Sequence, residues 1–246
     1  MNSDNTQFFI GTSGWSYPHW RGIFYPEDQP KNRWFEYYAQ QFSTVEVNAT
    51  FYRFFKDDTF RNWRERAPEG FRYVLKAPRV ITHRKYLQEV EQPIQQFWQS
   101  AQLLAGKFGV ILLQLAPNMP YDPERLRTAL LAFEEPSRIA VELRHPRWLT
   151  DEIHALLKET GAIFCAADSP DSDLVHWLPS KTAYIRLHGR KSMYAYNYSA
   201  HELREIAEFA QKTARLGAKT VYIFFNNDFQ GYAPKNAATL SEMLRG

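Results

Sequence analysis

Polar and ionisable side chains recur in short apolar segments of this sequence, at alternating positions. Residues 43–53 show the pattern first, because Glu46 and Asn48 alternate with Val45 and Val47. Successive side chains of a strand point to opposite faces, so the carboxylate and the amide share one face. A buried carboxylate costs several kcal/mol unless it is paired or hydrogen-bonded. Such a residue therefore indicates a site that uses its charge.

The same alternation in later segments predicts a shared polar face. Glu142 alternates with Arg144, and Arg186 with His188, each time around an apolar residue. Other apolar segments end in single polar residues, namely Lys76, Gln114, Asp168 and Asn226. In barrel enzymes the C-terminal ends of the strands and the loops that follow them form the active site. We therefore expect these side chains to line one site at the C-terminal ends of strands.

The ionisable members of this set suit acid–base catalysis. A carboxylate beside apolar residues can have its pKa raised toward neutrality, which suits Glu46 or Glu142 as a general acid or base. His188 could supply the second proton-transfer group. Lys76 could form a Schiff base in a lyase, although holding an anion is the simpler role. The predicted catalytic residues are Glu46, Glu142, His188, Asp168 and Lys76.

Arginine, lysine and aromatic residues also crowd the loops that follow these segments. Arginine binds phosphate or carboxylate through two parallel hydrogen bonds, and aromatic rings stack on bases or sugars. This composition favours a small anionic ligand that carries a ring, such as a phosphorylated one. The predicted ligand-binding residues are Ser13, Trp15, Asn48, Arg53, His83, Gln114, Arg144, Arg186, Tyr196 and Asn226.

Strand-like segments must position these residues. Segments of strand length, rich in β-branched and aromatic residues, cover residues 8–14, 43–51, 72–78, 109–117, 138–145, 162–168, 182–189 and 220–228. Segments with helical periodicity lie between them, at residues 33–42, 57–66, 94–107, 122–135, 150–160 and 199–217. Helix start signals are Asp122, Thr150 and the Ser199–Glu202 capping box, and Gly161 and Gly217 are stop signals.

This alternation predicts an α/β protein with a single (β/α)8 barrel of the TIM type over residues 1–246. About 250 residues is the usual size of such a barrel, and no linker or repeat divides the chain. A doubly wound open sheet is the alternative. No strand-like segment is followed by the glycine-rich turn that binds dinucleotides or by a phosphate-binding loop.

The composition sets further limits. Hydrophobic residues make up 44% of the chain, charged residues 23%, and the net charge is +3, so the chain can bury a large core and is only mildly basic. A single cysteine, Cys165, cannot form an internal disulfide. The sequence shows neither a signal-peptide pattern nor an apolar run of the roughly 18 residues of a membrane span. We therefore expect a cytoplasmic protein with no membrane partner.

Six motifs together resemble the DUF72 (YecE-like) family of bacterial and archaeal proteins. They are GTSGWSYPHW, VEVNATFYR, LKAPRVITH, VELRHPRW, YIRLHG and FFNNDFQGYAPKNA, in this order along nearly the whole chain. The resemblance implies a TIM-type barrel and no particular activity. It also implies a set of characteristic polar positions, which correspond to Thr12, Ser13, Trp15, Glu46, Asn48, Arg53, Lys76, His83, Glu142, Arg144, Asp168, Arg186, His188, Asn226, Gly231 and Asn236. Arg147 stands where the resemblance leads us to expect serine.

Three functions fit these residues. The first is a hydrolase or lyase without metal or other cofactor, acting on a phosphorylated sugar, a nucleotide or a nucleic-acid fragment. The second is a phosphodiesterase or isomerase that uses a divalent metal held by residues such as Glu46, Glu142, Asp168, His188 and His145. The third is a module that binds a nucleotide or nucleic acid without catalysis, since basic and aromatic loops suit single strands.

Overall fold

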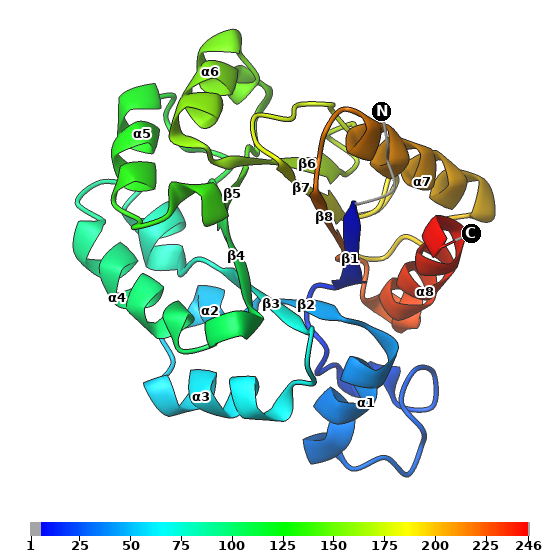
Figure 1. The fold of residues 1–246 in the computed structure, drawn as a ribbon. Coiled ribbons are helices and arrows are strands. Elements are labelled where there is room, and N and C mark those ends of the chain that lie inside the picture. Colours follow the sequence, from blue (N-terminus) through cyan, green and yellow to red (C-terminus); the bar gives the residue numbers. More distant parts are fainter. Residues whose placement is uncertain (1–5, 246) are drawn as a thin grey trace. The chain divides into compact units, whose positions relative to one another are not determined.

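Parallel strands alternate with helices along residues 6–245, the part of the chain that the computed structural model describes (Figure 1). The strands in this range are Gln7–Thr12 (β1), Thr44–Val47 (β2), Arg72–Lys76 (β3), Phe108–Gln114 (β4), Ile139–Glu142 (β5), Ile163–Asp168 (β6), Thr182–Leu187 (β7) and Thr220–Phe225 (β8). They form one sheet in the order β1-β8-β7-β6-β5-β4-β3-β2. Parallel strands in this order define a (β/α)8 barrel, so the predicted fold class is confirmed.

Most of the helices that follow the strands overlap the helical segments predicted from the sequence. Within residues 6–245 they are Trp34–Gln41 (α1), Ala49–Tyr52 (α2), Asp57–Arg66 (α3), Glu91–Gln102 (α4), Pro123–Leu131 (α5), Asp151–Thr160 (α6), Ala200–Arg215 (α7) and Tyr232–Arg245 (α8). The residues between β6 and β7 form no helix. None of the described helices is long and apolar enough to cross a membrane.

The predicted helix caps are present. The side chains of Asp122 and Thr150 each accept a hydrogen bond from a backbone N–H in the first turn of α5 and α6. Ser199 and Glu202 form the reciprocal capping box at the start of α7. Gly161 ends α6 in the left-handed conformation, with φ of +74°. Local sequence signals therefore fix these helix ends.

Two segments differ from the sequence prediction. Strand β2 ends at Val47, and the segment expected to continue it turns into α2, where Thr50 Oγ1 contacts the carbonyl oxygens of Val47 and Lys76 at 2.8 and 2.7 Å. The C-terminal helix α8 was not predicted. It follows Gly231 and contains Pro234 in its first turn, where a proline is tolerated because the N–H there needs no helical partner.

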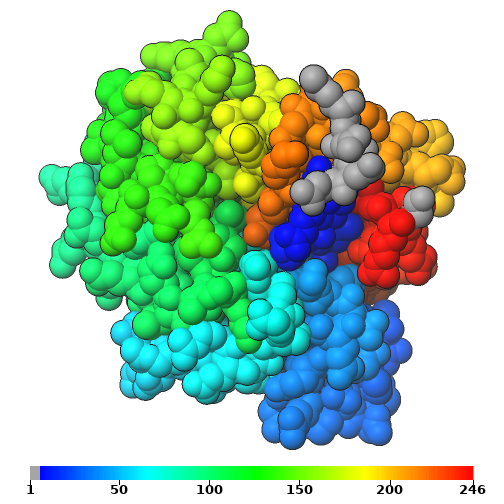
Figure 2. All heavy atoms as spheres, in the orientation of Figure 1, coloured from blue at the N-terminus to red at the C-terminus, as the bar shows by residue number. Residues whose placement is uncertain are grey.

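The chain packs as two compact units, each described by itself. The first unit consists of Met1–Glu46 and Ala166–Gly246, and the second of Val47–Cys165. In the first unit β8 pairs with β1 on one side and β7 on the other, and α8 lies against β1 although the two are far apart in sequence (Figures 1 and 2). Aromatic packing anchors its early loop, where Tyr25 stacks on Trp34 with ring centroids 4.7 Å apart.

The second unit is a strip of β3, β4 and β5 with α3 to α6 (Figure 1). The pairing of β3 with β4 and of β4 with β5 brings the polar residues at the ends of these strands into register. Lys76 pairs with Leu112 and Gln114 with Glu142, and residues two apart in β4 share a face. The side chains of Lys76, Gln114 and Glu142 therefore project from the same face of this strip. The prediction that residues 1–246 form a single domain stays a prediction.

Candidate functional site

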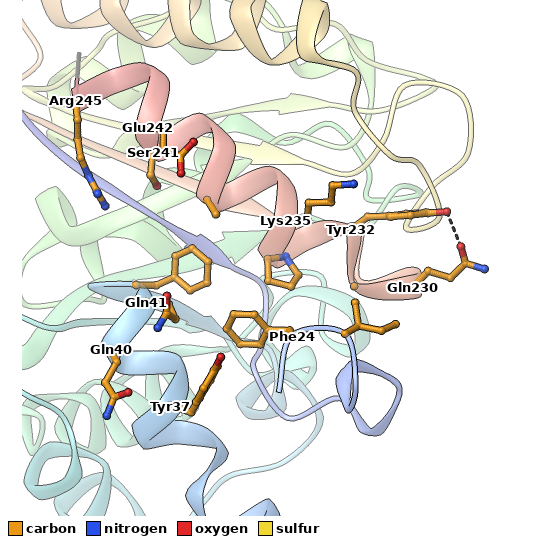
Figure 3. Close-up of a pocket in the computed structure, with 15 residues that line it drawn as sticks. Phe24, Tyr37, Gln40, Gln41, Gln230, Tyr232, Lys235, Ser241, Glu242 and Arg245 are labelled. Carbon is orange, nitrogen blue, oxygen red and sulfur yellow. Dashed lines mark hydrogen bonds between the residues drawn. The ribbon is translucent and has the colours of Figure 1, made fainter. Parts of the chain in front are cut away.

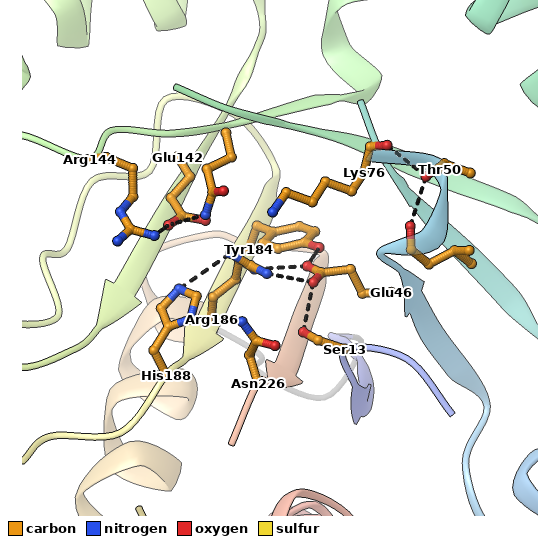
Figure 4. A network of polar contacts seen from close by, with 12 residues as sticks. Ser13, Glu46, Thr50, Lys76, Glu142, Arg144, Tyr184, Arg186, His188 and Asn226 are labelled. Atoms are coloured by element: carbon orange, nitrogen blue, oxygen red, sulfur yellow. Dashed lines mark hydrogen bonds and ion pairs between the residues drawn. The ribbon is translucent and has the colours of Figure 1, made fainter. Parts of the chain in front are cut away.

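The carboxylate of Glu46 is the centre of a buried polar cluster in the first unit (Figure 4). Arg186 donates from Nε to Oε2 at 2.9 Å and from Nη2 to Oε1 at 2.7 Å. The hydroxyls of Tyr184 and Ser13 donate to Oε2 and Oε1 at 2.5 and 2.7 Å. The side chains of Glu46 and Arg186 are 0% and 1% exposed, so this is an ion pair removed from water.

These contacts determine the charge of Glu46. Burial alone raises the pKa of the carboxyl, but the Arg186 charge and the hydrogen bonds from Arg186, Tyr184 and Ser13 outweigh it and hold the pKa below its ordinary value. The expectation of a raised pKa therefore does not hold for Glu46. It is a fixed anion at neutral pH, suited to holding Arg186 in place.

Arg186 connects this carboxylate to His188. Its Nη1 lies 3.3 Å from Nε2 of the imidazole, and Nδ1 lies 3.0 Å from the side-chain amide of Asn226. Both partner nitrogens carry N–H donors, so each contact requires His188 to accept a hydrogen bond, and a neutral imidazole can accept at only one of its two ring nitrogens. The predicted residues Ser13, Glu46, Arg186, His188 and Asn226 thus form one continuous network in the first unit.

The backbone around Ser13 is built for this network. The N–H of Gly14 donates to the carbonyl of Glu46 at 2.8 Å, and the hydroxyl of Tyr17 donates to the carbonyl of Ser13 at 2.5 Å. Gly14 has φ of +91°, and a Cβ there would lie 2.8 Å from the Tyr17 oxygen. Glycine is required at this position because both the backbone conformation and the close ring exclude a side chain.

A second polar network in the first unit contains Asp168. Arg190 donates from Nε to Asp168 Oδ2 at 3.1 Å and from Nη1 to Glu205 Oε2 at 2.6 Å. The predicted residue Tyr196 joins it by donating to Glu202 Oε1 at 2.5 Å. Burial raises the pKa of Asp168, although the Arg190 contact opposes the shift. Tyr196 therefore supports the loop after β7 through its hydroxyl.

In the second unit, Glu142 lies between polar groups from two strand ends. Gln114 donates from Nε2 to Glu142 Oε1 at 2.9 Å, and Arg144 Nη1 lies 3.4 Å from the same oxygen. Glu142 is fully buried, whereas the Arg144 side chain is 20% exposed. Figure 4 shows Lys76 and Arg144 extending toward Glu142. The predicted residues Gln114, Glu142 and Arg144 are thus in direct contact.

Lys76 and His83 lie against the same aromatic ring in this unit. Lys76 Nζ is 4.3 Å from the centre of the Phe51 ring, and the His83 ring meets Phe51 edge-on with centroids 4.9 Å apart. Burial, then the charges of Lys76 and Arg144, lower the pKa of His83 to about 4, while Glu142 opposes the shift. His83 is therefore a neutral imidazole at pH 7, beside two cations.

Other predicted residues lie outside these contacts. Arg53 is exposed, with its guanidinium 4.5 Å from the centre of the Phe55 ring. Trp15 packs edge-on against Phe35. Asn48 precedes α2, and its side-chain oxygen is buried without a hydrogen-bond partner in the described chain.

The metal-dependent alternative predicts that several carboxylates and imidazoles lie close enough together to bind one divalent ion. Within residues 6–245, no group of three or more histidine, cysteine, aspartate or glutamate side chains has the arrangement of a metal site. His145 accepts a hydrogen bond from the backbone N–H of Arg147 at 3.1 Å and is exposed. Glu46 uses its carboxylate oxygens to accept hydrogen bonds from Arg186, Tyr184 and Ser13. The described residues therefore do not offer a ligand set for this alternative.

Sequence reasoning missed two residues that support these clusters. Tyr184 is buried and contacts Glu46, and Thr82 Oγ1 lies 2.8 Å from His83 Nδ1. Tyr184 precedes Arg186 by two residues in β7, so the period-2 rule places both on one face. The same register that identified Arg186 could therefore have identified Tyr184. Thr82 gave no comparable signal.

A groove of about 620 Å³ lies elsewhere in the first unit, between α1 and α8 (Figure 3). Tyr37 and Gln40 line it from α1, and Lys235, Glu242 and Arg245 line it from α8. None of the predicted site residues lines this groove. Its chemistry is therefore separate from that of the polar clusters.

Comparison with known proteins places the chain in a family. A family model described as "Protein of unknown function DUF72" matches residues 9–246. The chain belongs to the DUF72 family. It is similar to UPF0759 protein YunF of Bacillus subtilis (strain 168), with 22% identity across 96% of this chain and 94% of that protein.

Solved structures agree on the fold. A DUF72 family protein from Thermotoga maritima MSB8 matches 98% of this chain and 100% of its own, with 26% identity and a TM-score of 0.90. One from Enterococcus faecalis V583 matches 98% of this chain and 96% of its own, with 21% identity and a TM-score of 0.85. A xylose isomerase domain containing protein from Salmonella typhimurium LT2 covers 100% of both chains at 14% identity, with a TM-score of 0.57, and shares the fold alone.

Proposed function

We propose that this protein is a hydrolase or lyase that acts on a small anionic ligand carrying a ring, without a metal or other cofactor. The observation that carries the proposal is the charge arrangement in the second unit. Arg144 contacts the buried carboxylate of Glu142, and the charges of Lys76, Arg144 and Glu142 all act on the neutral His83. Cations held near one another at one face favour an anionic ligand.

Each side chain of this group has a role in the proposal. Glu142 acts as general acid or base, because a buried carboxylate that contacts a polar network can exchange a proton with a bound ligand. Lys76 and Arg144 hold the anion and stabilise developing negative charge. His83 is available as a neutral imidazole at pH 7, since its pKa is about 4.

The first-unit residues have supporting roles. Glu46 stays ionised and holds Arg186, so it acts as a fixed electrostatic element. His188 uses both ring nitrogens in contacts with Arg186 and Asn226, so proton transfer by His188 would require one contact to break. Burial raises the pKa of Asp168, while the contact with Arg190 opposes the shift.

Turnover assays with panels of phosphoesters and glycosides test the proposal. We expect a hit, and we expect Glu142→Gln to lower its kcat by about 10²- to 10⁴-fold, which is the usual contribution of a general acid or base. The matched control is Glu65→Gln, which changes an exposed carboxylate on α3 and should leave kcat unchanged. An active hit that keeps its kcat in Glu142→Gln contradicts the assignment.

Metal content is measured on the same preparation. Elemental analysis of protein purified without chelators should find no stoichiometric divalent metal. A metal bound at one equivalent, with activity lost on its removal, would overturn the metal-free mechanism in favour of the metal-dependent alternative.

A further inference from the structure

The segment after β3 presents His83 on an unusual turn. Residues Val80–Arg84 form a π-helical turn, a conformation that recurs at functional sites. The residues that follow include three non-glycine residues with left-handed backbone, Tyr86, Leu87 and Glu89, at φ of 48°, 63° and 48°. Such conformations persist only where surrounding structure enforces them. His83 therefore lies in a π-helical turn that is followed by a strained segment.

Thr82 determines which nitrogen of His83 carries the proton. Thr82 is buried, and in the described chain its hydroxyl has a hydrogen-bond partner only in Nδ1 of His83, at 2.8 Å. If Nδ1 carried the proton, the buried Thr82 O–H would have no acceptor, which is unfavourable. If the hydroxyl donates to Nδ1, both groups are satisfied and the proton of the neutral ring lies on Nε2.

The groups around His83 are mostly donors. Lys76 contacts the same Phe51 ring as His83, and the charges of Lys76 and Arg144 both act on the imidazole. Glu142, the opposing carboxylate, accepts hydrogen bonds from Gln114 and Arg144 at Oε1. An ammonium, a guanidinium and an imidazole Nε2–H offer N–H donors and no acceptors. A phosphate oxyanion, whose oxygens accept several hydrogen bonds, matches this set.

We propose that Lys76, His83 and Arg144 bind a phosphoryl group, and that Thr82 is the positioning residue that fixes His83 as an Nε2–H donor. This inference specifies the anion of the proposed function and rests on the same site. The neutral imidazole remains a donor across the range from pH 5 to 8. Lys76 and Arg144 supply the positive charge, and His83 supplies a directed hydrogen bond without adding a third cation.

Binding of inorganic phosphate tests this assignment without any need for turnover. Titration calorimetry should show phosphate binding to the wild-type chain. Thr82→Val, which keeps the shape of the side chain but removes the hydroxyl, should weaken binding by about tenfold, and His83→Ala by at least as much. Thr82→Ser keeps the donor and should restore binding. The matched control is Thr239→Val on α8, which changes a half-buried threonine and should leave binding unchanged.

Nitrogen-15 NMR of the histidine rings gives a readout that a purely structural role would not change. His83 should show the Nε2–H tautomer in the wild type and lose that preference in Thr82→Val, while circular dichroism confirms that the variant is folded. Absence of phosphate binding, or equal binding in Thr82→Val and wild type with an Nδ1–H ring, would overturn the proposal.

Two further comparisons complete the test. The first distinguishes a phosphate ester from free phosphate as the ligand, and the second distinguishes failure of the phosphoryl site from failure of the proposed catalysis. Ribose 5-phosphate binding more tightly than inorganic phosphate indicates a phosphate ester, and equal affinity indicates free phosphate as the ligand; both support the phosphoryl site. Acetate binding as tightly as phosphate contradicts it. Phosphate binding without turnover on any panel refutes the proposed catalysis alone. Turnover of a ligand without phosphate, together with no phosphate binding, refutes the phosphoryl site alone.

Discussion

Arg186 is a buried cation that contacts both a carboxylate and an imidazole. Nε and Nη2 bind the carboxylate of Glu46, and Nη1 reaches the imidazole of His188. A buried charge is tolerated when it is paired and its donors are satisfied, and removing one partner leaves an uncompensated ion. The hydroxyls of Tyr184 and Ser13 donate further hydrogen bonds to the carboxylate of Glu46. The cluster therefore depends on each of its members.

Substitution of Tyr184 tests that dependence at a single hydroxyl. Tyr184→Phe removes one donor to Glu46 without creating a large cavity, so we expect the free energy of unfolding to fall by about 1–3 kcal/mol, the range for losing a partner of a buried charged group. Chemical denaturation measures it. Tyr121→Phe removes a more exposed tyrosine hydroxyl that donates to Glu152, and it should change stability by less than about 0.5 kcal/mol. Equal effects of the two substitutions would contradict our view of the buried network.

Alternation along strands identified most of the residues in the polar clusters. Glu46, Glu142 and Arg186 are on the expected strand faces because a period of two follows from backbone geometry. Tyr184 and Thr82 were missed because an aromatic ring and a hydroxyl also suit an ordinary core. Arg53 was expected at the site but lies exposed on Phe55, since the chain turns into α2 before reaching it. Sequence alone does not show where an extended segment turns.

The loop between β7 and α7 is the element that closes around His188. The N–H of Tyr194 donates to the carbonyl of His188 at 2.7 Å, and Gly189 N–H donates to the hydroxyl of Tyr198 at 2.8 Å. Gly189 has φ of +105°, and a Cβ there would lie 2.5 Å from Cβ of Tyr196. This loop therefore has one conformation that its own backbone and side chains enforce.

A pair of glycine substitutions separates backbone strain from crowding. Gly70→Ala changes a glycine with φ of +78° and open space around it, so it should cost about 1–2 kcal/mol of unfolding free energy from backbone strain. Gly189→Ala adds the clash with Tyr196 and should cost more. Chemical denaturation of both variants measures the difference. A smaller loss in Gly189→Ala than in Gly70→Ala would show that the loop relaxes easily.

Helix boundaries were predictable where side chains cap the backbone, as at Asp122 and Ser199. Helix α8 was missed because Gly231 and Pro234 at its start are more typical of a turn than of a helix. Packing against β1 and α7 stabilises α8 where its own helix propensity is insufficient, and the local sequence does not reveal this packing.

At the scale of the whole molecule, the strand and helix order was sufficient to predict the barrel. Apolar segments of strand length separated by helical ones allow few topologies, and the right-handed crossover rule reduces them further. The reaction was not predictable in the same way, because one barrel supports many chemistries through its loops. Membership of the DUF72 family agrees with this fold, but the family has no assigned function, so the activity must be found by experiment.

The pH dependence of stability is a property of the whole chain that Glu46 should dominate at low pH. Its folded-state pKa is below the ordinary value of 4.5, so its stabilising contribution is present above that pH and is lost as pH falls through the folded-state pKa. Asp168 acts in the opposite direction, because its folded-state pKa is raised. We expect the unfolding free energy of the wild type to fall below about pH 4.5.

Denaturation curves between pH 3 and 7 measure this dependence. Glu46→Gln should be less stable at pH 7 by about 3–5 kcal/mol, since it leaves Arg186 unpaired, and it should lose part of the decline at low pH. A variant with the same pH profile as the wild type would show that other carboxylates control acid unfolding.

The separation of Glu46 and Arg186 along the chain has a consequence for biosynthesis. The two residues are 140 positions apart, and a ribosome adds about 5–20 residues per second. For seconds after Glu46 leaves the exit tunnel, its partner does not yet exist. Strand β2 therefore cannot be buried in its native form during that interval, and the nascent chain must keep Glu46 hydrated. The ion pair between Glu46 and Arg186, and the native burial of β2 that depends on it, therefore cannot form before the last quarter of translation.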